Sequence, residues 1–513
     1  MKIGIFTNYS PFIKLESEGL GRYLGGLIKG FIESGCEVTI ACPSWGKKSI
    51  QTLLKDLSIN EERVTFLTTG KALPIWHIYE SYLKGKNREK RHIDYQKYAR
   101  HYIERLFRQD KWSTFLLQSV GAAFASVLFS IAIALIKILS IPMRVMKKVF
   151  SMILSVPASF IDEDLVSSLF LEMIENTEKQ LVDIINNSDS MDIWYVPALF
   201  WPRVCDIKNQ AVVINAPDLV TAEYPGAFAN IMDGYHSGLC KRTILNGNNF
   251  ITYCDYIGRE LIDKSYGGLG KKWYAIPHAN HDLMPDIGIS NRVSSKMNTD
   301  ENMTREFAKS IVNSIVINSK SFSGKSISNV HYIFYASQLR PNKNLFNLIK
   351  GYEHLIHNCF RHEKLILTGR IVDNKEFKKY LDEHDLLNDV IFCSNVSNQQ
   401  LAALYYCADL VVNPTLYEGG FPFTFGEGMS VGTPSIMSDI PQTRDVLEPA
   451  GLECMMFNPY DYMDIASKME WALDNLDELY GLELPLYEEM AKRTDKSVAE
   501  EYLGLFKSIK TSV

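Results

Sequence analysis

The chain has 513 residues, and at roughly 150 residues per domain this length is too great for one compact domain. Hydrophobic residues make up 46% of the chain and charged residues 22%, and these fractions exclude intrinsically disordered and fibrous proteins. The chain has 60 acidic and 54 basic residues and a net charge of -6. This balance argues against a dedicated nucleic-acid-binding protein, because such proteins neutralise phosphates with an excess of Lys and Arg.

The nine cysteines are scattered and include no C-x-x-C pair, so the sequence predicts neither a disulfide framework nor a zinc site. The N-terminus, MKIGIFTNYS, contains no cleavable apolar leader, and we therefore expect no secretion signal. Both features predict a cytoplasmic protein.

Short apolar runs alternate with helical patterns in two successive series. The first series opens with a strand at 2–8, a glycine-containing turn and a helix at 23–32, an order typical of a doubly wound α/β domain. Its other strands are expected at 37–42, 64–68, 193–196, 211–215, 250–253 and 273–276. The strands of the second series are expected at 331–337, 364–368, 390–393, 409–413 and 434–437.

An apolar segment interrupts the first series. Residues 112–136 include no Asp, Glu, Lys, Arg or His, and as a helix they would extend about 37 Å, more than the ~30 Å hydrocarbon core of a bilayer. The next residues, 137–160, are apolar but contain basic side chains, which is typical of an interfacial helix. A single crossing is excluded because the strands on either side should share one sheet. An interfacial or re-entrant hairpin, two crossings, or a buried helical subdomain remain, and we favour contact with a membrane surface.

The stretch 409–441 predicts a strand, a glycine turn at 419–420 and a helix that starts at Pro422. Such a turn offers backbone N–H groups and a helix N-terminus to a phosphate. Glu418 and Glu427 flank this anion site, where carboxylates are suited to accept hydrogen bonds from sugar hydroxyls. The alternative interpretation is a strand, turn and helix with two solvated glutamates.

These motifs resemble those of the retaining glycosyltransferases of family 4. The matching residues are Leu416-Tyr417-Glu418-Gly419, Phe421-Pro422, Glu427 and Gly432-Thr433-Pro434. The resemblance implies that Glu418 contacts the donor sugar, that Glu427 binds the nucleotide ribose, and that the turn residues Gly419, Gly420 and Phe421 bind the donor. Eight residues separate the two glutamates here, whereas the family usually has seven.

The resemblance also implies an α/β architecture of the GT-B type, with two Rossmann-like domains facing across a cleft. The apolar segment described above adds a helical hydrophobic insertion to the first domain. We expect an acceptor-side domain, an interdomain segment, a nucleotide-sugar-binding domain and a C-terminal helix that crosses back to the first domain. The predicted ranges are 1–285, with the insertion at about 100–185, then 286–330, 331–483 and 484–513.

The stretch 334–344, FYASQLRPNKN, resembles the family motif that supplies a diphosphate-binding Arg and Lys. Lys343 matches the family Lys, whereas Gln338 stands at the Arg position and Arg340 is the expected substitute. Two cations there would stabilise the charge on a departing nucleoside diphosphate. Further along the chain, backbone groups near Val396 are expected to bind the edge of the nucleotide base.

Two glycines and one aspartate of the first domain are further candidates. Gly19 and Gly21 follow the first strand, and the resemblance places them at the donor, although a plain tight turn is the alternative. Asp218 matches the family's strand end, but Pro217 occupies the position of the family's histidine. Either a neighbour such as Asp218 acts in its place or catalysis is weak, and we take Asp218 as the candidate.

No metal site is predicted, because the one D-x-D pattern, Asp162-Glu163-Asp164, follows the apolar insertion. The resemblance implies that cationic side chains and a helix N-terminus neutralise the diphosphate instead, with a nucleotide sugar as co-substrate and no other cofactor. His278 and His281 lie in the stretch 276–282 and are interpreted as linker residues rather than as ligands.

We therefore expect a retaining glycosyltransferase that moves a hexose to a lipid-linked glycan at the inner face of the plasma membrane. Mannose is preferred because the motifs resemble those of bacterial surface-polysaccharide mannosyltransferases. One alternative is a catalytically silent GT-B subunit that binds the membrane or a partner, which Pro217 and the altered glutamate spacing motivate. Another is a two-pass membrane component of transport or assembly.

Overall fold

The structure is a computed structural model that describes residues 1–13, 15, 19–70, 163–226, 231–268, 270–288, 299–317, 330–369 and 375–511. The hydrophobic segment 112–160 and the D-x-D residue Asp162 lie outside the described residues. The chain divides into two compact units, each described by itself. One comprises Met1–Gly25, Cys36–Val196 and Arg203–Val212, and the other comprises Gly26–Gly35, Pro197–Pro202 and Val213–Val513.

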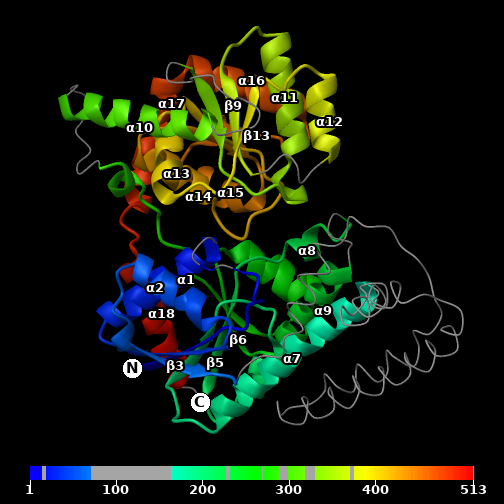
Figure 1. The fold of residues 1–513 in the computed structure, drawn as a ribbon, viewed down its shortest axis with the longest axis vertical. Helices are drawn as coiled ribbons and strands as arrows, with labels where there is room; N and C mark the ends of the chain where they lie inside the picture. Colours follow the sequence, from blue (N-terminus) through cyan, green and yellow to red (C-terminus); the bar gives the residue numbers. More distant parts are fainter. Residues whose placement is uncertain are drawn as a thin grey trace, which may run out of the picture. The chain divides into compact units, whose positions relative to one another are not determined.

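The first sheet has seven strands in the order β3-β2-β1-β4-β5-β6-β7, and Figure 1 labels β3, β5 and β6 among them. Its strands are Lys2–Phe6 (β1), Glu37–Cys42 (β2), Val64–Thr68 (β3), Ile193–Val196 (β4), Ala211–Ala216 (β5), Asn249–Thr252 (β6) and Lys272–Ala275 (β7). β1 pairs in parallel with both β2 and β4, so the strand order reverses at β1. β3 and β4 belong to the same sheet, which confirms the premise that the strands on either side of the apolar insertion share one sheet.

The helices of this half of the chain connect the strands. The longest is α7, which begins at Glu163 and leads into β4. The helices are Gly19–Glu33 (α1), Lys47–Asp56 (α2), Glu163–Asn186 (α7), Val220–Glu223 (α8) and Ile231–Asn246 (α9), with a π-helical segment at Ile257–Ser265.

The second sheet has six parallel strands in the order β10-β9-β8-β11-β12-β13. They are Tyr332–Tyr335 (β8), Lys364–Thr368 (β9), Val390–Cys393 (β10), Leu410–Asn413 (β11), Ser435–Ser438 (β12) and Met456–Phe457 (β13). From β8 the chain adds β9 and β10 on one side of the sheet, and from β11 it adds β12 and β13 on the other side. The topological switch point of this sheet therefore lies between β8 and β11.

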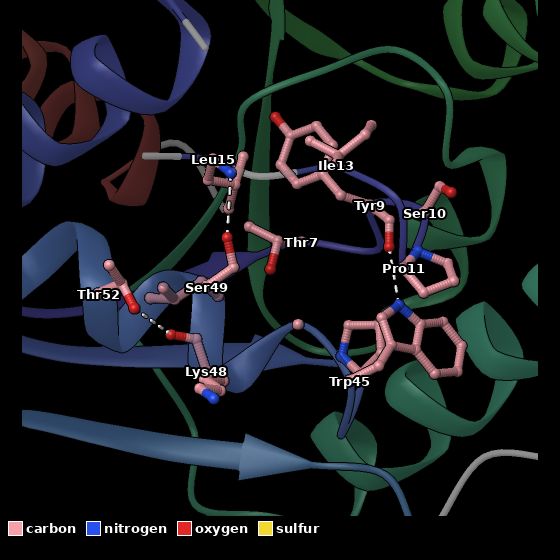
Figure 2. Close-up of a pocket in the computed structure, with 13 residues that line it drawn as sticks. Thr7, Tyr9, Ser10, Pro11, Ile13, Leu15, Trp45, Lys48, Ser49 and Thr52 are labelled. Carbon is pink, nitrogen blue, oxygen red and sulfur yellow. Dashed lines mark hydrogen bonds between the residues drawn. The ribbon is translucent and has the colours of Figure 1, made fainter. Parts of the chain in front are cut away.

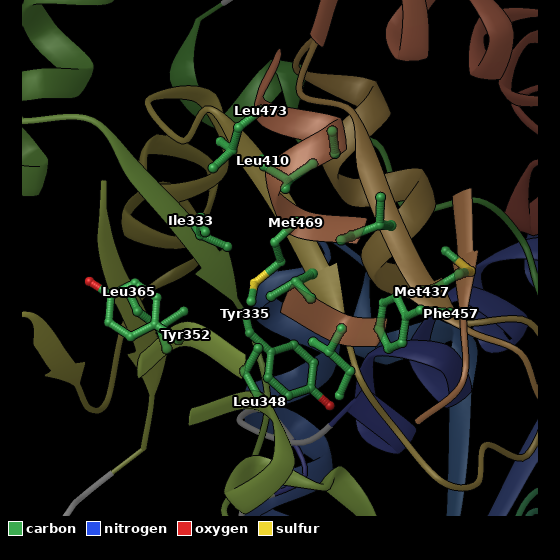
Figure 3. Packing of buried hydrophobic residues seen from close by; sticks show 14 of the residues in the cluster. Ile333, Tyr335, Leu348, Tyr352, Leu365, Leu410, Met437, Phe457, Met469 and Leu473 are labelled. Atoms are coloured by element: carbon green, nitrogen blue, oxygen red, sulfur yellow. The ribbon is translucent and has the colours of Figure 1, made fainter. Parts of the chain in front are cut away.

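Helices cover both faces of the second sheet. They are Thr299–Ile317 (α10), Leu345–His357 (α11), Lys375–Glu383 (α12), Asn398–Tyr406 (α13), Phe423–Ser430 (α14), Pro441–Leu447 (α15), Tyr462–Asp474 (α16) and Leu476–Met490 (α17), and the helix that follows them is Asp495–Lys510 (α18). Alternate residues of β8 enter different cores: Ile333 and Tyr335 pack with α11 and α16 (Figure 3), whereas Tyr332 and Phe334 pack with α10 and α13. Both faces are buried, which explains why the strands are continuous apolar runs.

Helix α18 packs against the second half of α1. The ring of Phe31 lies 6.4 Å from that of Tyr502 and 5.9 Å from that of Phe506. Gly30 allows this approach, because a Cβ at its position would lie 2.5 Å from the Cβ of Ala499. The C-terminal helix thus contacts a helix of the first α/β series.

All twelve predicted strands occur in the structure, and five have the predicted bounds: β2, β3, β4, β9 and β10. The helix predicted at 23–32 starts earlier, at Gly19, and α14 starts at Phe423 with Pro422 as its cap. β13 was not predicted because its two residues are too few for a periodic signal.

The described helices include none that is both long and apolar enough to span a bilayer. All nine cysteines are free thiols. Burial raises the pKa of the Cys42 and Cys393 thiols to about 12, so both behave as small apolar groups in the sheets.

Glu483 of α17 is fully buried beside β12. Its carboxyl oxygens both accept the Ser435 N–H, at 3.0 and 3.1 Å. Burial raises the pKa of Glu483 well above its usual value, because desolvation disfavours the charged form.

We expect Glu483→Gln to stabilise the protein relative to the unchanged chain, by an amount that increases as pH rises. The unfolded chain releases the Glu483 proton above a pKa of about 4.3, while the folded protein retains it. The stability of the unchanged protein therefore falls relative to the variant as pH rises from that value toward the raised folded-state pKa. Calorimetric melting temperatures between about pH 5 and about pH 8 measure this difference. Glu478→Gln, at an exposed position of the same helix, is the control, and a pH-independent difference for Glu483→Gln would contradict the argument.

Candidate functional site

The candidate site lies at the switch point of the second sheet, where the loops after β8 and β11 meet. Open α/β sheets bind ligands at this position, beyond the carboxyl ends of the strands. The loop after β8 contains Arg340 and Lys343, and the loop after β11 contains Glu418 and the turn at 419–420. Two segments about seventy residues apart in the chain are thus brought together by the strand order.

Two buried asparagines hold these loops against each other. Asn342 donates from Nδ2 to the Tyr417 backbone carbonyl at 3.2 Å, and the backbone carbonyl of Asn342 accepts the Leu416 N–H at 2.8 Å. Asn344 donates from Nδ2 to the Pro414 carbonyl at 3.0 Å. Asn344 has a φ of +55°, a conformation that Asn tolerates better than most residues. The sequence analysis missed both asparagines, although they lie on either side of Lys343 in the motif.

Lys343 forms an ion pair with Glu418. The Nζ to Oε1 distance is 2.5 Å, and each side chain keeps about a fifth of its surface exposed, 20% and 19%. Arg340 lies three residues before Lys343, at the start of the same short turn, and is exposed. Both cations can therefore be reached by an anionic ligand.

Asp218 follows β5 and interacts electrostatically with the same groups. Its Oδ1 accepts the Val220 N–H at 2.7 Å. Desolvation raises its pKa and the Glu418 charge adds to the shift, while the Val220 N–H, Lys343 and Arg340 act in the opposite direction. The residue still has solvent access, so a ligand can reach it. The four residues predicted as catalytic therefore form one charge cluster.

The turn at Gly419 and Gly420 packs closely on the loop after β5 and on Tyr253. A Cβ at Gly419 would lie 1.7 Å from the Pro217 carbonyl oxygen, and one at Gly420 would lie 2.7 Å from the Tyr253 Cβ. Nearby, the Tyr417 hydroxyl accepts the Leu219 N–H at 2.8 Å. The first glycine is required because its neighbour is backbone, which cannot move aside as a side chain can.

Glu427 lies on α14 and is 5% exposed. Tyr405 donates its hydroxyl to Oε2 at 2.7 Å, and His281 Nδ1 lies 2.8 Å from Oε1. A carboxylate has about four lone-pair positions, so both oxygens can still accept from a ligand. His281, interpreted from the sequence as a linker residue, is thus a direct partner of the predicted ribose-binding glutamate, 146 positions away.

His278 supports the start of α14. Its ring stacks on Phe423 with centroids 3.7 Å apart, and its Nε2 lies 2.8 Å from the Phe421 carbonyl oxygen. Desolvation lowers its pKa, so the ring is neutral at pH 7. The residue therefore positions the glycine turn and does not supply a charge.

The remaining predicted residues have different surroundings. The Phe421 ring packs on Phe425 in the core, with centroids 5.4 Å apart, so its backbone is the part that a ligand can meet. Val396 lies between β10 and α13 and packs on the core below. Gly19 and Gly21 belong to the other unit, where a Cβ at Gly21 would lie 1.8 Å from the Leu15 carbonyl oxygen. Their roles toward a donor stay predictions.

Within the described ranges no group of three or more His, Cys, Asp or Glu side chains is arranged to hold a metal ion. The cationic groups of the site are Arg340 and Lys343, and its neutral donors include the backbone of the glycine turn. This set of groups suits a phosphate and a polyhydroxylated ligand rather than a metal.

Comparison with known proteins agrees with this geometry. Residues 317–496 match the family described as Glycosyl transferases group 1. A stretch of 139 residues is 30% identical to an MMP alpha-(1->4)-mannosyltransferase of Mycolicibacterium hassiacum, covering 26% of this chain and 34% of that enzyme. A stretch of 157 residues is 30% identical to the serotype-specific mannosyltransferase WbdA of Escherichia coli, covering 30% of this chain and 18% of that protein. The chain thus aligns with about a third of these relatives or less.

Solved structures resemble the whole chain. Sucrose-phosphate synthase of Thermosynechococcus elongatus superposes with a TM-score of 0.56 at 12% identity and covers 100% of both chains. HepE of Anabaena in complex with UDP has a TM-score of 0.54 at 11% identity, covering 99% of each chain. At such low identity the likeness concerns the fold alone, and it confirms the predicted GT-B architecture.

We expect Gly419→Ala to destabilise the protein by about 1–3 kcal/mol, the usual cost of forcing atoms into a packed region. The new Cβ would overlap the Pro217 carbonyl, so the turn or the loop must move. Gly481→Ala is the matched control, because no atom lies within 4 Å of a Cβ there and a helical Ala is favoured by up to about 1 kcal/mol. Urea unfolding measures both changes, and equal effects would show that the close approach is unimportant.

Proposed function

We propose, from the match of residues 317–496 to the family described as Glycosyl transferases group 1, that the protein is a retaining, nucleotide-sugar-dependent glycosyltransferase. It transfers a hexose, with mannose preferred, from a nucleoside diphosphate to a lipid-linked glycan. The observation that carries the proposal is the cluster of Arg340, Lys343, Glu418 and Asp218 at the switch point, beside a glycine turn and the start of α14.

Each part of a nucleotide sugar has a partner in this cluster. Arg340 and Lys343 bind the diphosphate and stabilise the charge that develops on it as the glycosidic bond breaks. The N–H groups of the Gly419–Gly420 turn and of the first turn of α14 add neutral donors. Glu418 accepts hydroxyls of the donor sugar, and Glu427 accepts those of the ribose.

Asp218 takes the place of the histidine that Pro217 replaces. Its raised pKa makes it hold a proton more readily than an ordinary carboxyl. The negative charge of a bound diphosphate would raise that pKa further. Asp218 therefore offers a carboxyl that can orient a hydroxyl of the reacting sugar by a hydrogen bond.

Two cations next to the diphosphate position can neutralise it without a divalent ion, so the proposal includes no metal and no further cofactor. The preference for mannose is supported by the two mannosyltransferase relatives. The lipid-linked acceptor and the site of action at the inner membrane face rest on the apolar composition of 112–136 and on the basic residues that follow it.

A first experiment is to measure thermal shifts with UDP, GDP, ADP and TDP, together with release of the nucleoside diphosphate from its mannose and glucose conjugates. A ligand that binds only the folded protein stabilises it by about 2.7 kcal/mol at a hundred times its dissociation constant. A selective shift and donor hydrolysis support the enzyme. The absence of both a thermal shift and donor hydrolysis would favour the silent subunit. That alternative is motivated by the absent histidine and by the eight-residue spacing of the glutamates.

Lys343→Ala should lower kcat by about 10²–10³-fold, because a preorganised charge on the leaving group is lost. Lys379→Ala is the control, since this lysine on α12 is 73% exposed and pairs with Glu383. Steady-state rates with the preferred donor measure both variants. A kcat for Lys343→Ala within about twofold of the control, at equal melting temperature, would refute the placement of the diphosphate.

His281→Ala should weaken binding of the nucleoside diphosphate by about 5–10-fold, the effect of one hydrogen bond to a charged group. His281→Asn retains a donor near the Nδ1 position and should restore most of the affinity. Calorimetric titration with the 2′,3′-dideoxy nucleotide is the decisive comparison, because this ligand lacks the ribose hydroxyls. If His281 acts through Glu427 and the ribose, His281→Ala should not weaken binding of that ligand. An equal loss with both nucleotides would mean that His281 is only structural.

A further inference from the structure

A cavity of about 220 Å³ lies beyond the carboxyl ends of β1 and β2. Its walls come from the loop that follows β1, residues 7–13 and 15, and from the loop and first turns of α2, residues 43–52 (Figure 2). The residues of both loops belong to one compact unit of the structure. The donor site described above uses none of them.

The wall of this cavity includes an aromatic ring held in a fixed orientation. Trp45 donates its indole N–H to the Tyr9 carbonyl at 2.9 Å, and Ser49 Oγ accepts the Leu15 N–H at 3.0 Å, which ties the two loops together. Figure 2 shows Trp45 on one side of the cavity and Ser49 and Leu15 on the other, with Thr7 between them. The cavity is therefore preformed, and one side presents an indole ring.

The chemistry of the lining favours a carbohydrate. Hydroxyl groups come from Thr7, Ser10, Ser49 and Thr52, and no Asp, Glu, His or Cys lines the cavity. Thr7 donates its hydroxyl proton to the Ala41 carbonyl, so its oxygen is left to accept. An aromatic face with a few placed hydroxyls matches a sugar ring, which has an apolar C–H face and a polar rim. Lys48 is the one charged residue of the lining and is exposed to solvent, and with no carboxylate or imidazole in the lining the cavity is suited to bind a neutral ligand.

The size of the cavity restricts the ligand. Its volume is below the about 300–1,000 Å³ of sites that hold drug-sized molecules, so it accepts one pyranose ring and excludes a nucleotide. Because ligands of open α/β sheets bind beyond the carboxyl ends of the strands, a sugar here lies at the functional edge of its sheet. The nucleotide already has a site of suitable charge at the other sheet.

We propose that this cavity is a subsite for one neutral pyranose residue of the acceptor glycan, with Trp45 as its stacking platform. This inference rests on the proposed glycosyltransferase function. It assigns part of the acceptor specificity to Trp45 and to the hydroxyls opposite it, independently of the donor.

The test uses methyl α-D-mannopyranoside as the probe, with the methyl glucoside and galactoside for comparison. Saturation-transfer NMR without donor should detect contact between the probe's C–H face and the full-length protein. Trp45→Ala should weaken binding about 5–10-fold, the value of one aromatic contact, and Trp45→Phe should retain most of it. Trp471→Phe, on α16, is the control. Ile13→Trp, at an exposed position of the wall, should fill the cavity and abolish binding in case Trp45→Ala does not fold.

Transfer from the preferred donor to the methyl glycoside gives the second readout. Trp45→Ala should raise the KM for this acceptor about 5–10-fold, with a smaller change in kcat. No binding of any of the three glycosides, or equal binding by Ile13→Trp and the unchanged protein, would overturn the subsite. Binding without any change in the acceptor KM would overturn its role in the acceptor. Donor hydrolysis by the unchanged protein tests the proposed function separately, because it needs no acceptor.

Discussion

The contact between the Gly419 backbone and the Pro217 carbonyl is the constraint on which the site depends. A Cβ at position 419 would lie 1.7 Å from that oxygen, so the two chain segments touch along their backbones. This contact brings the loop after β5 to the loop after β11, and it places Asp218 within the field of Glu418, Lys343 and Arg340. Backbone contacts of this kind hold charged side chains in position, so the charged groups do not have to hold the loops together themselves. Those groups therefore stay available to a ligand.

The charges of the cluster balance, and this balance explains how it can exist without a ligand. Lys343 pairs with Glu418 at 2.5 Å while each keeps about a fifth of its surface exposed, so the pair is neither fully desolvated nor fully screened. A diphosphate would compete with Glu418 for Lys343, and Glu418 would then be free to accept sugar hydroxyls. One ion pair can thus prepare two binding functions, because breaking it releases a cation and an acceptor at the same time. Burying either group without its partner would cost far more.

The sequence predicted the fold well because both sheets are parallel and covered on both faces. Their strands are continuous apolar runs such as KLILT and VIFC, whose bounds could be read directly. The site was predictable to the extent that its residues lie close together in the chain, as Arg340 and Lys343 do, or follow a family motif, as Glu418 and Glu427 do. The contact of His281 with Glu427 was not predicted, because the two residues are 146 positions apart and no local sequence pattern indicates such a pair. Asn342 and Asn344 were missed for a similar reason, since their partners lie on another loop.

The replacement of the family's histidine by Pro217 changes the electrostatics of the site. His278 is the histidine next to the glycine turn, with Nε2 2.8 Å from the Phe421 carbonyl oxygen, but desolvation lowers its pKa. A neutral ring stacked on Phe423 cannot supply the charge or the proton of a catalytic histidine, and its contacts hold the start of α14 in place. Under the proposed function, positive charge at the diphosphate therefore comes from Arg340 and Lys343, and a hydrogen bond to the reacting sugar falls to Asp218. Desolvation and the Glu418 charge raise the pKa of Asp218, whereas Lys343 and Arg340 lower it, so this carboxyl is electrostatically coupled to the same two cations that a diphosphate would bind.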